Sequence, residues 1–183
     1  NKCRIKNILN NYSSISFNFG PTLLSWMKRH KPDIYDSIIN ADIESCKRFS
    51  GHGAAIAQVY NHIIMPLANL RDKRTQIIWG IKDFQYHYNR FPEGMWLAET
   101  AVDLESLDIM SELGIKFTIL APHQAQKVKA INSDEWHGVS GQKIDHKIPY
   151  ILKLPSNRTI TIFFYDGPIS RDIDFQDTLE NGE

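Results

Sequence analysis

The sequence lacks the features of a membrane, nucleic-acid-binding or disulfide-stabilised protein. None of its hydrophobic runs approaches the roughly 20 residues that a membrane-spanning helix needs. Basic and acidic side chains balance at 21 each, so no positive surplus indicates binding to nucleic acid or to an acidic membrane face. The two cysteines, Cys3 and Cys46, have no metal-ligand spacing, and the first residues show no signal-peptide pattern. We therefore expect a cytoplasmic globular protein with no cofactor.

Strand-like and helix-like segments alternate along most of the 183 residues. Apolar spacing predicts strands over 14–18, 94–98 and 117–121, with a strand or extended segment over 54–60. The same analysis predicts helices over 2–10, 21–29, 71–89, 104–113 and 124–130 and one that begins at Pro32, and a capping box from Thr100 to Asp103. Segments 148–154 and 159–165 flank a hairpin turn at 155–158. This order predicts an α/β fold with mostly parallel strands, and four or five strand–helix units would make most of a small barrel.

Polar side chains follow the predicted strands at the points where they end. Asn18, Glu99, His123 and Asp166 each occupy such a position, and Gln124 follows His123. The carboxyl ends of parallel strands share one face, where α/β proteins bind ligands. Loops are polar in any case, so a single residue of this kind would also fit a purely structural role. The four together indicate a ligand site.

Glu99 has the most specific position of these residues. It follows the apolar sequence Met95-Trp96-Leu97-Ala98, so its carboxylate is expected beside apolar surface, where it could act as a nucleophile or a general acid. Trp96 would offer a face on which a sugar ring stacks. The structural alternative is a carboxylate that stabilises the start of the following helix.

Five segments of the sequence resemble glycoside hydrolase family 57. They are SFNFGPTLL at 16–24, NHIIMPL at 61–67, WGIKDF at 79–84, RFPEGMWLAE at 90–99 and FFYDGPISRDI at 163–173. They occur in the family's order and extend over nearly the whole chain. The resemblance implies that residues 1–183 are part of one catalytic barrel of the irregular (β/α)7 type.

The resemblance also implies retaining chemistry on α-glucans, by hydrolysis or by glycosyl transfer. Glu99 matches the family's nucleophile, and His62 matches a histidine that lines the sugar site. Asp166, His123 and Asn18 are expected on the substrate side with Trp96. The family's opening motif, similar to His-x-His-Gln-Pro, is absent, and the block with the general acid is expected beyond Glu183. On these grounds, the chain alone should be inactive.

Two other functions remain open from the sequence. A metal-dependent polysaccharide deacetylase has a related barrel and commonly uses histidines four residues apart, whereas no two of the seven histidines here have that spacing. A glucan-binding barrel without catalytic activity would keep Trp96 and lack the acid. In each case the expected partner is an oligosaccharide or polysaccharide; the oligomeric state is not readable from the sequence.

Overall fold

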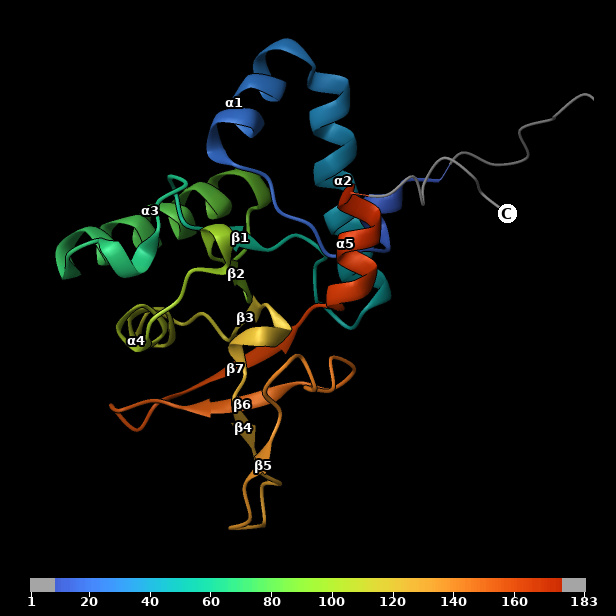
Figure 1. The fold of residues 1–183 in the computed structure, drawn as a ribbon. Coiled ribbons are helices and arrows are strands. Elements are labelled where there is room, and N and C mark those ends of the chain that lie inside the picture. Colours follow the sequence, from blue (N-terminus) through green and yellow to red (C-terminus); the bar gives the residue numbers. More distant parts are fainter. Residues whose placement is uncertain (1–8, 176–183) are drawn as a thin grey trace, which may run out of the picture.

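A computed structural model describes residues 9–175, and the helix predicted over 2–10 lies almost wholly outside that range (Figure 1). The longer helices are α1 (Pro21–His30), α2 (Pro32–Arg48), α3 (Leu70–Tyr88), α4 (Leu104–Glu112) and α5 (Gly167–Phe175). Short 3₁₀ helices are η1 (Asn11–Ser13), η2 (Met65–Leu67), η3 (Ala98–Thr100) and η4 (Pro122–Gln124). The strands are β1 (Ala57–Gln58), β2 (Met95–Trp96), β3 (Phe117–Leu120), β4 (Lys127–Val128), β5 (His137–Gly138), β6 (Tyr150–Lys153) and β7 (Thr159–Phe164).

Parallel pairing connects successive segments of the chain side by side. Strand β1 pairs in parallel with β2, and β3 pairs in parallel with β7. Single parallel bridges from Phe17 to Ala55 and from Gly94 to Phe117 join these pairs into one series. Strand β6 pairs antiparallel with β7, and β4 pairs antiparallel with β5. The α/β class is therefore confirmed, while the sheets are mixed.

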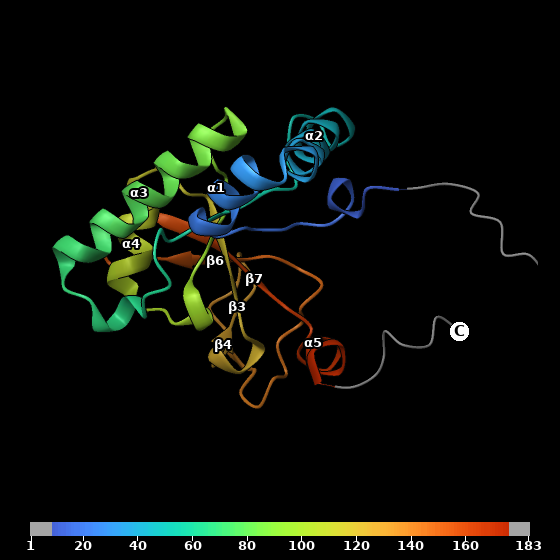
Figure 2. The ribbon, with the colours of Figure 1, turned by 90° about the horizontal axis from the view of Figure 1, so that it is seen from above.

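Helices α1 to α4 lie on one side of this series of strands, and α5 lies apart from them (Figure 2). Figures 1 and 2 show α3 and α4 next to each other, and the α1–α2 pair beside α3 and the first strands. Gly80 of α3 lies directly over β1, where a Cβ atom at position 80 would be only 2.1 Å from the carbonyl oxygen of Gln58. Only glycine lets the two backbones approach this closely. In Figure 1, the β4–β5 hairpin extends from the end of the molecule that lies opposite the α1–α2 pair.

One hydrophobic core joins the strands to the helices. Its fully buried side chains come from every layer and include Leu24, Met65, Ile77, Met95, Leu97, Met110, Ile115 and Ile160. Burial of each such side chain stabilises the fold by about 1.5–3 kcal/mol. The core therefore holds the short strands in place although their own hydrogen-bond ladders are brief.

Most predicted elements are confirmed, and three predictions are wrong. Segment 14–18 forms a single bridge at Phe17 in place of a strand. Segment 124–130 is not a helix, because the chain enters η4 through Pro122 and then pairs as β4. Thr100 does not cap α4, since its φ of 52° is left-handed, and the Asp103 side chain accepts the bond from the Ser106 N–H instead. Helix α5 was not expected.

Among residues 9–175, no helix is both long enough and apolar enough to cross a membrane.

Candidate active site

The predicted site residues lie just after the parallel-paired segments. Asn18 follows the bridge at Phe17, His62 follows β1, Glu99 follows β2, His123 follows β3 and Asp166 follows β7. Parallel pairing puts these ends on the same side of the strand series. The predicted placement of polar groups at one set of strand ends is therefore present in the fold.

Glu99 and His62 form the most direct contact among the predicted residues. The Nε2 atom of His62 is 2.9 Å from Oε1 of Glu99, although the two residues are 37 positions apart. Both side chains are about two-thirds exposed, at 66% for His62 and 69% for Glu99. The Glu99 carboxylate is thus accessible to a ligand from solvent, while the His62 imidazole contacts one of its two oxygens.

The backbone that carries Glu99 is strained. Glu99 has φ 55° and ψ 21°, and Thr100 follows with φ 52°, a conformation that is uncommon for residues other than glycine and rare for a β-branched one. Such residues cost about 1–3 kcal/mol each and gather at functional sites. Leu97 and Ala98 are buried just before this turn, so the core fixes its beginning.

Trp96 lies at the end of β2, three residues before Glu99, and Asn18 follows the bridge at Phe17. The side chain of Asn18 donates a hydrogen bond of 2.6 Å to Oε1 of Gln58, which pairs in register with Trp96. Gln58 was missed by the sequence analysis, although a polar residue between Ala57 and Val59 in an apolar strand was a usable signal. The three residues form a row next to the Glu99 turn.

Asp166 lies at a larger hollow beside α5. One of its oxygens is 3.1 Å from Nε2 of His146, and the other accepts a hydrogen bond of 3.0 Å from the Ile169 N–H at the start of the helix. The hollow measures about 600 Å³, within the usual range for ligand pockets. Its lining comprises Pro122, Gln142, Ile144, Asp145, His146, Lys147, Tyr165, Asp166, Gly167, Pro168 and Ile169.

The predicted residues do not all meet at one point. Within residues 9–175, no hydrogen bond or ion pair joins Asp166, Asn18 or His123 to Glu99. His123 is exposed on η4, in which Pro122 lines the hollow and Gln124 donates to the Thr100 carbonyl oxygen. His146, the partner of Asp166, was not predicted because its sequence neighbourhood is a polar loop without a periodic pattern.

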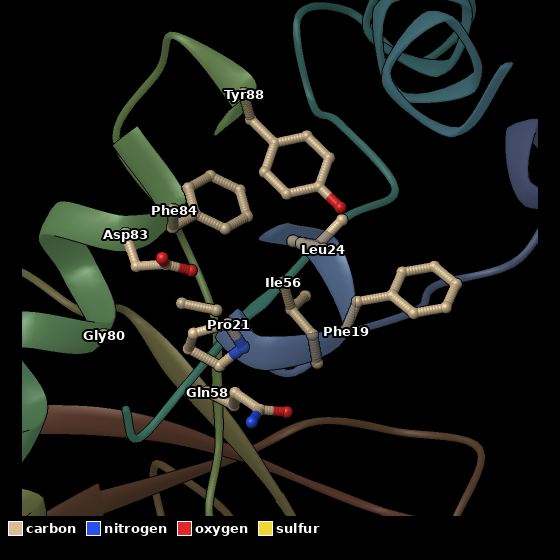
Figure 3. Close-up of a pocket in the computed structure, with 10 residues that line it drawn as sticks. Phe19, Pro21, Leu24, Ile56, Gln58, Gly80, Asp83, Phe84 and Tyr88 are labelled. Atoms are coloured by element: carbon tan, nitrogen blue, oxygen red, sulfur yellow. The ribbon is translucent and has the colours of Figure 1, made fainter. Parts of the chain in front are cut away.

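A second cavity lies under α3 and is too small for a sugar. Figure 3 shows the carboxylate of Asp83 directed into it, beside Phe84 and below Tyr88. The volume of about 10 Å³ has room for about one water molecule. Burial raises the pKa of Asp83 and lowers the pKa of the neighbouring His87. This cluster therefore belongs to the packing of α3.

The chain belongs to glycosyl hydrolase family 57, because the sequence model of that family matches residues 3–181. No curated protein matches the sequence significantly. No group of three His, Cys, Asp or Glu side chains that could hold a metal is found among residues 9–175.

Solved structures share the fold. The 4-α-glucanotransferase from Thermococcus litoralis is 20% identical with a TM-score of 0.62, over 93% of this chain and 24% of that one. A maltose-forming exo-amylase from a Pyrococcus species is 19% identical with a TM-score of 0.63, over 89% and 24% of the two chains. A protein assigned as a polysaccharide deacetylase from Mycobacterium smegmatis is 16% identical with a TM-score of 0.54, over 86% and 43%. This chain thus spans about a quarter of the length of the first two.

Proposed function

We propose that this chain is part of a retaining glycoside hydrolase or transglycosylase that acts on α-glucans, with Glu99 as the nucleophile. The observation that carries the proposal is the exposed Glu99 carboxylate, paired with His62 at the ends of neighbouring parallel strands, in a member of glycosyl hydrolase family 57. Two structural neighbours, a glucanotransferase and an amylase, support α-glucan as the substrate class.

The chemistry needs two carboxyl groups about 5–5.5 Å apart. Glu99 would attack the anomeric carbon of the bound glucosyl unit, forming an ester bond as the glycosidic bond breaks. The Nε2–H of His62 would donate a hydrogen bond to one oxygen of the ionised carboxylate and so orient the other oxygen toward the sugar. The second carboxyl group protonates the leaving oxygen and then activates water or an acceptor hydroxyl. We expect this acid in the part of the parent protein that follows Glu183.

The remaining predicted residues would bind the substrate. Trp96 would stack on a sugar ring beside the row formed with Asn18 and Gln58. Asp166, with His146, would contact hydroxyls of the glucan chain along the hollow of about 600 Å³. His123, exposed on η4, would contact further hydroxyls outside that hollow. We further propose that the strand series is a segment of an irregular (β/α)7 barrel, which the parallel order of the first segments supports.

The decisive experiment is the substitution Glu99→Gln in the full-length protein. The amide keeps the shape of the side chain and is a far weaker nucleophile, so we expect kcat on maltooligosaccharides to fall at least about 1,000-fold while glucan binding is retained. Glu44→Gln, an exposed position on α2, is the matched control and should leave kcat unchanged. Near-normal turnover by Glu99→Gln would refute the assignment.

Azide rescue distinguishes a nucleophile from a residue that only binds substrate. In Glu99→Ala, sodium azide should restore turnover of α-glucosyl fluoride and yield the β-glucosyl azide, because azide enters from the face that the carboxylate occupied. Product anomer is read by NMR. An α-linked azide, or hydrolysis with inversion in the wild type, would contradict retaining chemistry at Glu99.

A further inference from the structure

The turn that presents Glu99 is also held by a side chain from a 3₁₀ helix that follows β3. Gln124 of η4 donates a hydrogen bond of 2.8 Å from Nε2 to the carbonyl oxygen of Thr100. The Oε1 atom of the same side chain accepts a hydrogen bond of 2.8 Å from the N–H of Ala121, which is fully buried at the end of β3. Gln124 therefore connects the end of β3 to the peptide group that follows Thr100.

A bridge at this point constrains the strained backbone directly. Both Glu99 and Thr100 have left-handed φ angles, so relaxation of either would rotate the Thr100 carbonyl away from Gln124. The next anchor along the chain is Asp103, which with Glu105 accepts hydrogen bonds from the buried Lys73. Residues 99–102 thus lie between the core at Leu97 and the ion pairs at Asp103. Within them, the N–H groups of Thr100 and Ala101 donate to the carbonyl oxygens of Leu97 and Ala98, and Gln124 adds a side-chain contact from η4.

We propose that Gln124 is a positioning residue that sets the direction of the Glu99 carboxylate for attack on the sugar. The inference rests on the proposed function. His62 contacts an oxygen of Glu99, and Gln124 fixes the backbone from which that side chain extends. Without the bridge, the turn shifts toward ordinary φ angles, and a displacement of about 1 Å at a reacting group costs roughly 100-fold in rate.

The test uses Gln124→Glu and Gln124→Met in the full-length protein. Glutamate keeps the acceptor for the Ala121 N–H but turns a carboxylate oxygen toward the Thr100 carbonyl, whereas methionine removes both bonds at similar size. Gln126→Glu, an exposed position two residues later, adds the same charge as a control. Steady-state kinetics are measured on a maltooligosaccharide and on α-glucosyl fluoride, whose leaving group needs no proton from the enzyme.

We expect both Gln124 variants to lose 10- to 100-fold in kcat on both substrates, with KM within about threefold of wild type and the control unchanged. Unchanged kcat in a folded Gln124→Glu would overturn the proposal. So would a loss confined to the maltooligosaccharide, because the affected step would then be protonation of the leaving group. Glu99→Gln is assayed in parallel. If it is inactive while Gln124 variants are normal, only the positioning role fails; if it is fully active, both proposals fail.

Discussion

The Glu99 site lies at the carboxyl ends of the strands. Charged residues that are buried at the other, amino-terminal ends have a structural role. Asp42 of α2 is 2% exposed and accepts hydrogen bonds of 2.8 and 2.7 Å from the Arg90 guanidinium and of 2.8 Å from the Ala55 N–H. Arg90 also donates to the carbonyl oxygen of Ala55. These bonds join α2, the segment before β1 and the segment before β2. At the residue scale, Asp42 and Arg90 therefore stabilise the packing of α2 against the starts of β1 and β2.

Asp42→Asn should be strongly destabilising. The substitution leaves the Arg90 charge partly buried without its carboxylate, which typically costs about 3–5 kcal/mol. The free energy of unfolding in urea at pH 7 measures the change. The control is Asp108→Asn, because Asp108 pairs with Arg158 at the surface, at 2.9 Å, and such pairs contribute less than about 1 kcal/mol. Equal losses in the two variants would contradict this account.

At the element scale, the fit of α3 against β1 decides where the site row lies. Gly80 faces the backbone of Gln58, whose side chain holds Asn18 and whose register partner is Trp96. A helix that moved away from β1 would therefore also displace these side chains. Helices ordinarily favour alanine over glycine, but at position 80 the backbone of Gln58 leaves no space for a Cβ atom.

Gly80→Ala should destabilise the protein although it raises helix propensity. The propensity gain is about 1 kcal/mol, whereas overpacking against fixed backbone costs about 1–3 kcal/mol, and the added Cβ would lie only 2.1 Å from the Gln58 carbonyl oxygen. Urea unfolding monitors stability, and tryptophan fluorescence monitors packing. Gly138→Ala serves as control, since its Cβ would meet nothing within 4 Å. An increase in stability at position 80 would show that α3 is not in close contact with β1.

At the scale of the whole molecule, stability depends on pH through each group whose pKa differs between the folded and unfolded states, and His87 is one such group. The side chain of His87 is fully buried, with Nδ1 3.0 Å from the Tyr35 hydroxyl and Nε2 3.6 Å from an oxygen of Asp83. Burial lowers the pKa of His87, and the positive charge of Lys28 adds to that effect. The neutral imidazole is thus the form that the fold favours.

Stability should fall as the solution becomes more acidic than the ordinary histidine pKa of about 6.5. The unfolded state then binds a proton that the folded state resists, so the contribution of neutral His87 is complete above that pH and is lost as pH falls through the lowered value. One such proton gives a slope of at most about 1.4 kcal/mol per pH unit. Asp83, whose pKa is raised by burial, acts in the opposite direction at more acidic pH.

The measurement is urea unfolding of wild type and His87→Gln between pH 5 and 8. Glutamine cannot titrate, so the slope below about pH 6.5 should be reduced in this variant. His137→Gln, at an exposed position on β5, should keep the slope of the wild type. Identical curves for the wild type and His87→Gln would show that other groups cause the pH dependence.

Prediction from sequence succeeded where the signal was local. Helices α2 to α4 were predicted because each carries recurring apolar positions on one face, and α1 because Pro21 suits the first position of a helix. The β6–β7 hairpin was predicted because its turn residues lie between two apolar runs. Glu99 was placed after its strand correctly. The prediction at 124–130 failed because pairing of β4 with the distant β5 outweighed a weak helical pattern.

The sequence by itself determined the alternation of helices and strands, the family and the residues that follow each strand, because these depend on neighbours a few positions apart. Only the tertiary structure decided that Glu99 meets His62 across 37 positions, that Gln124 reaches the Thr100 carbonyl, and that Asp166 pairs with His146. The left-handed backbone conformation at Glu99 was likewise decided only by the tertiary structure. A conformation with a local energetic cost persists only where contacts from distant segments hold it, and no short window of sequence contains those contacts.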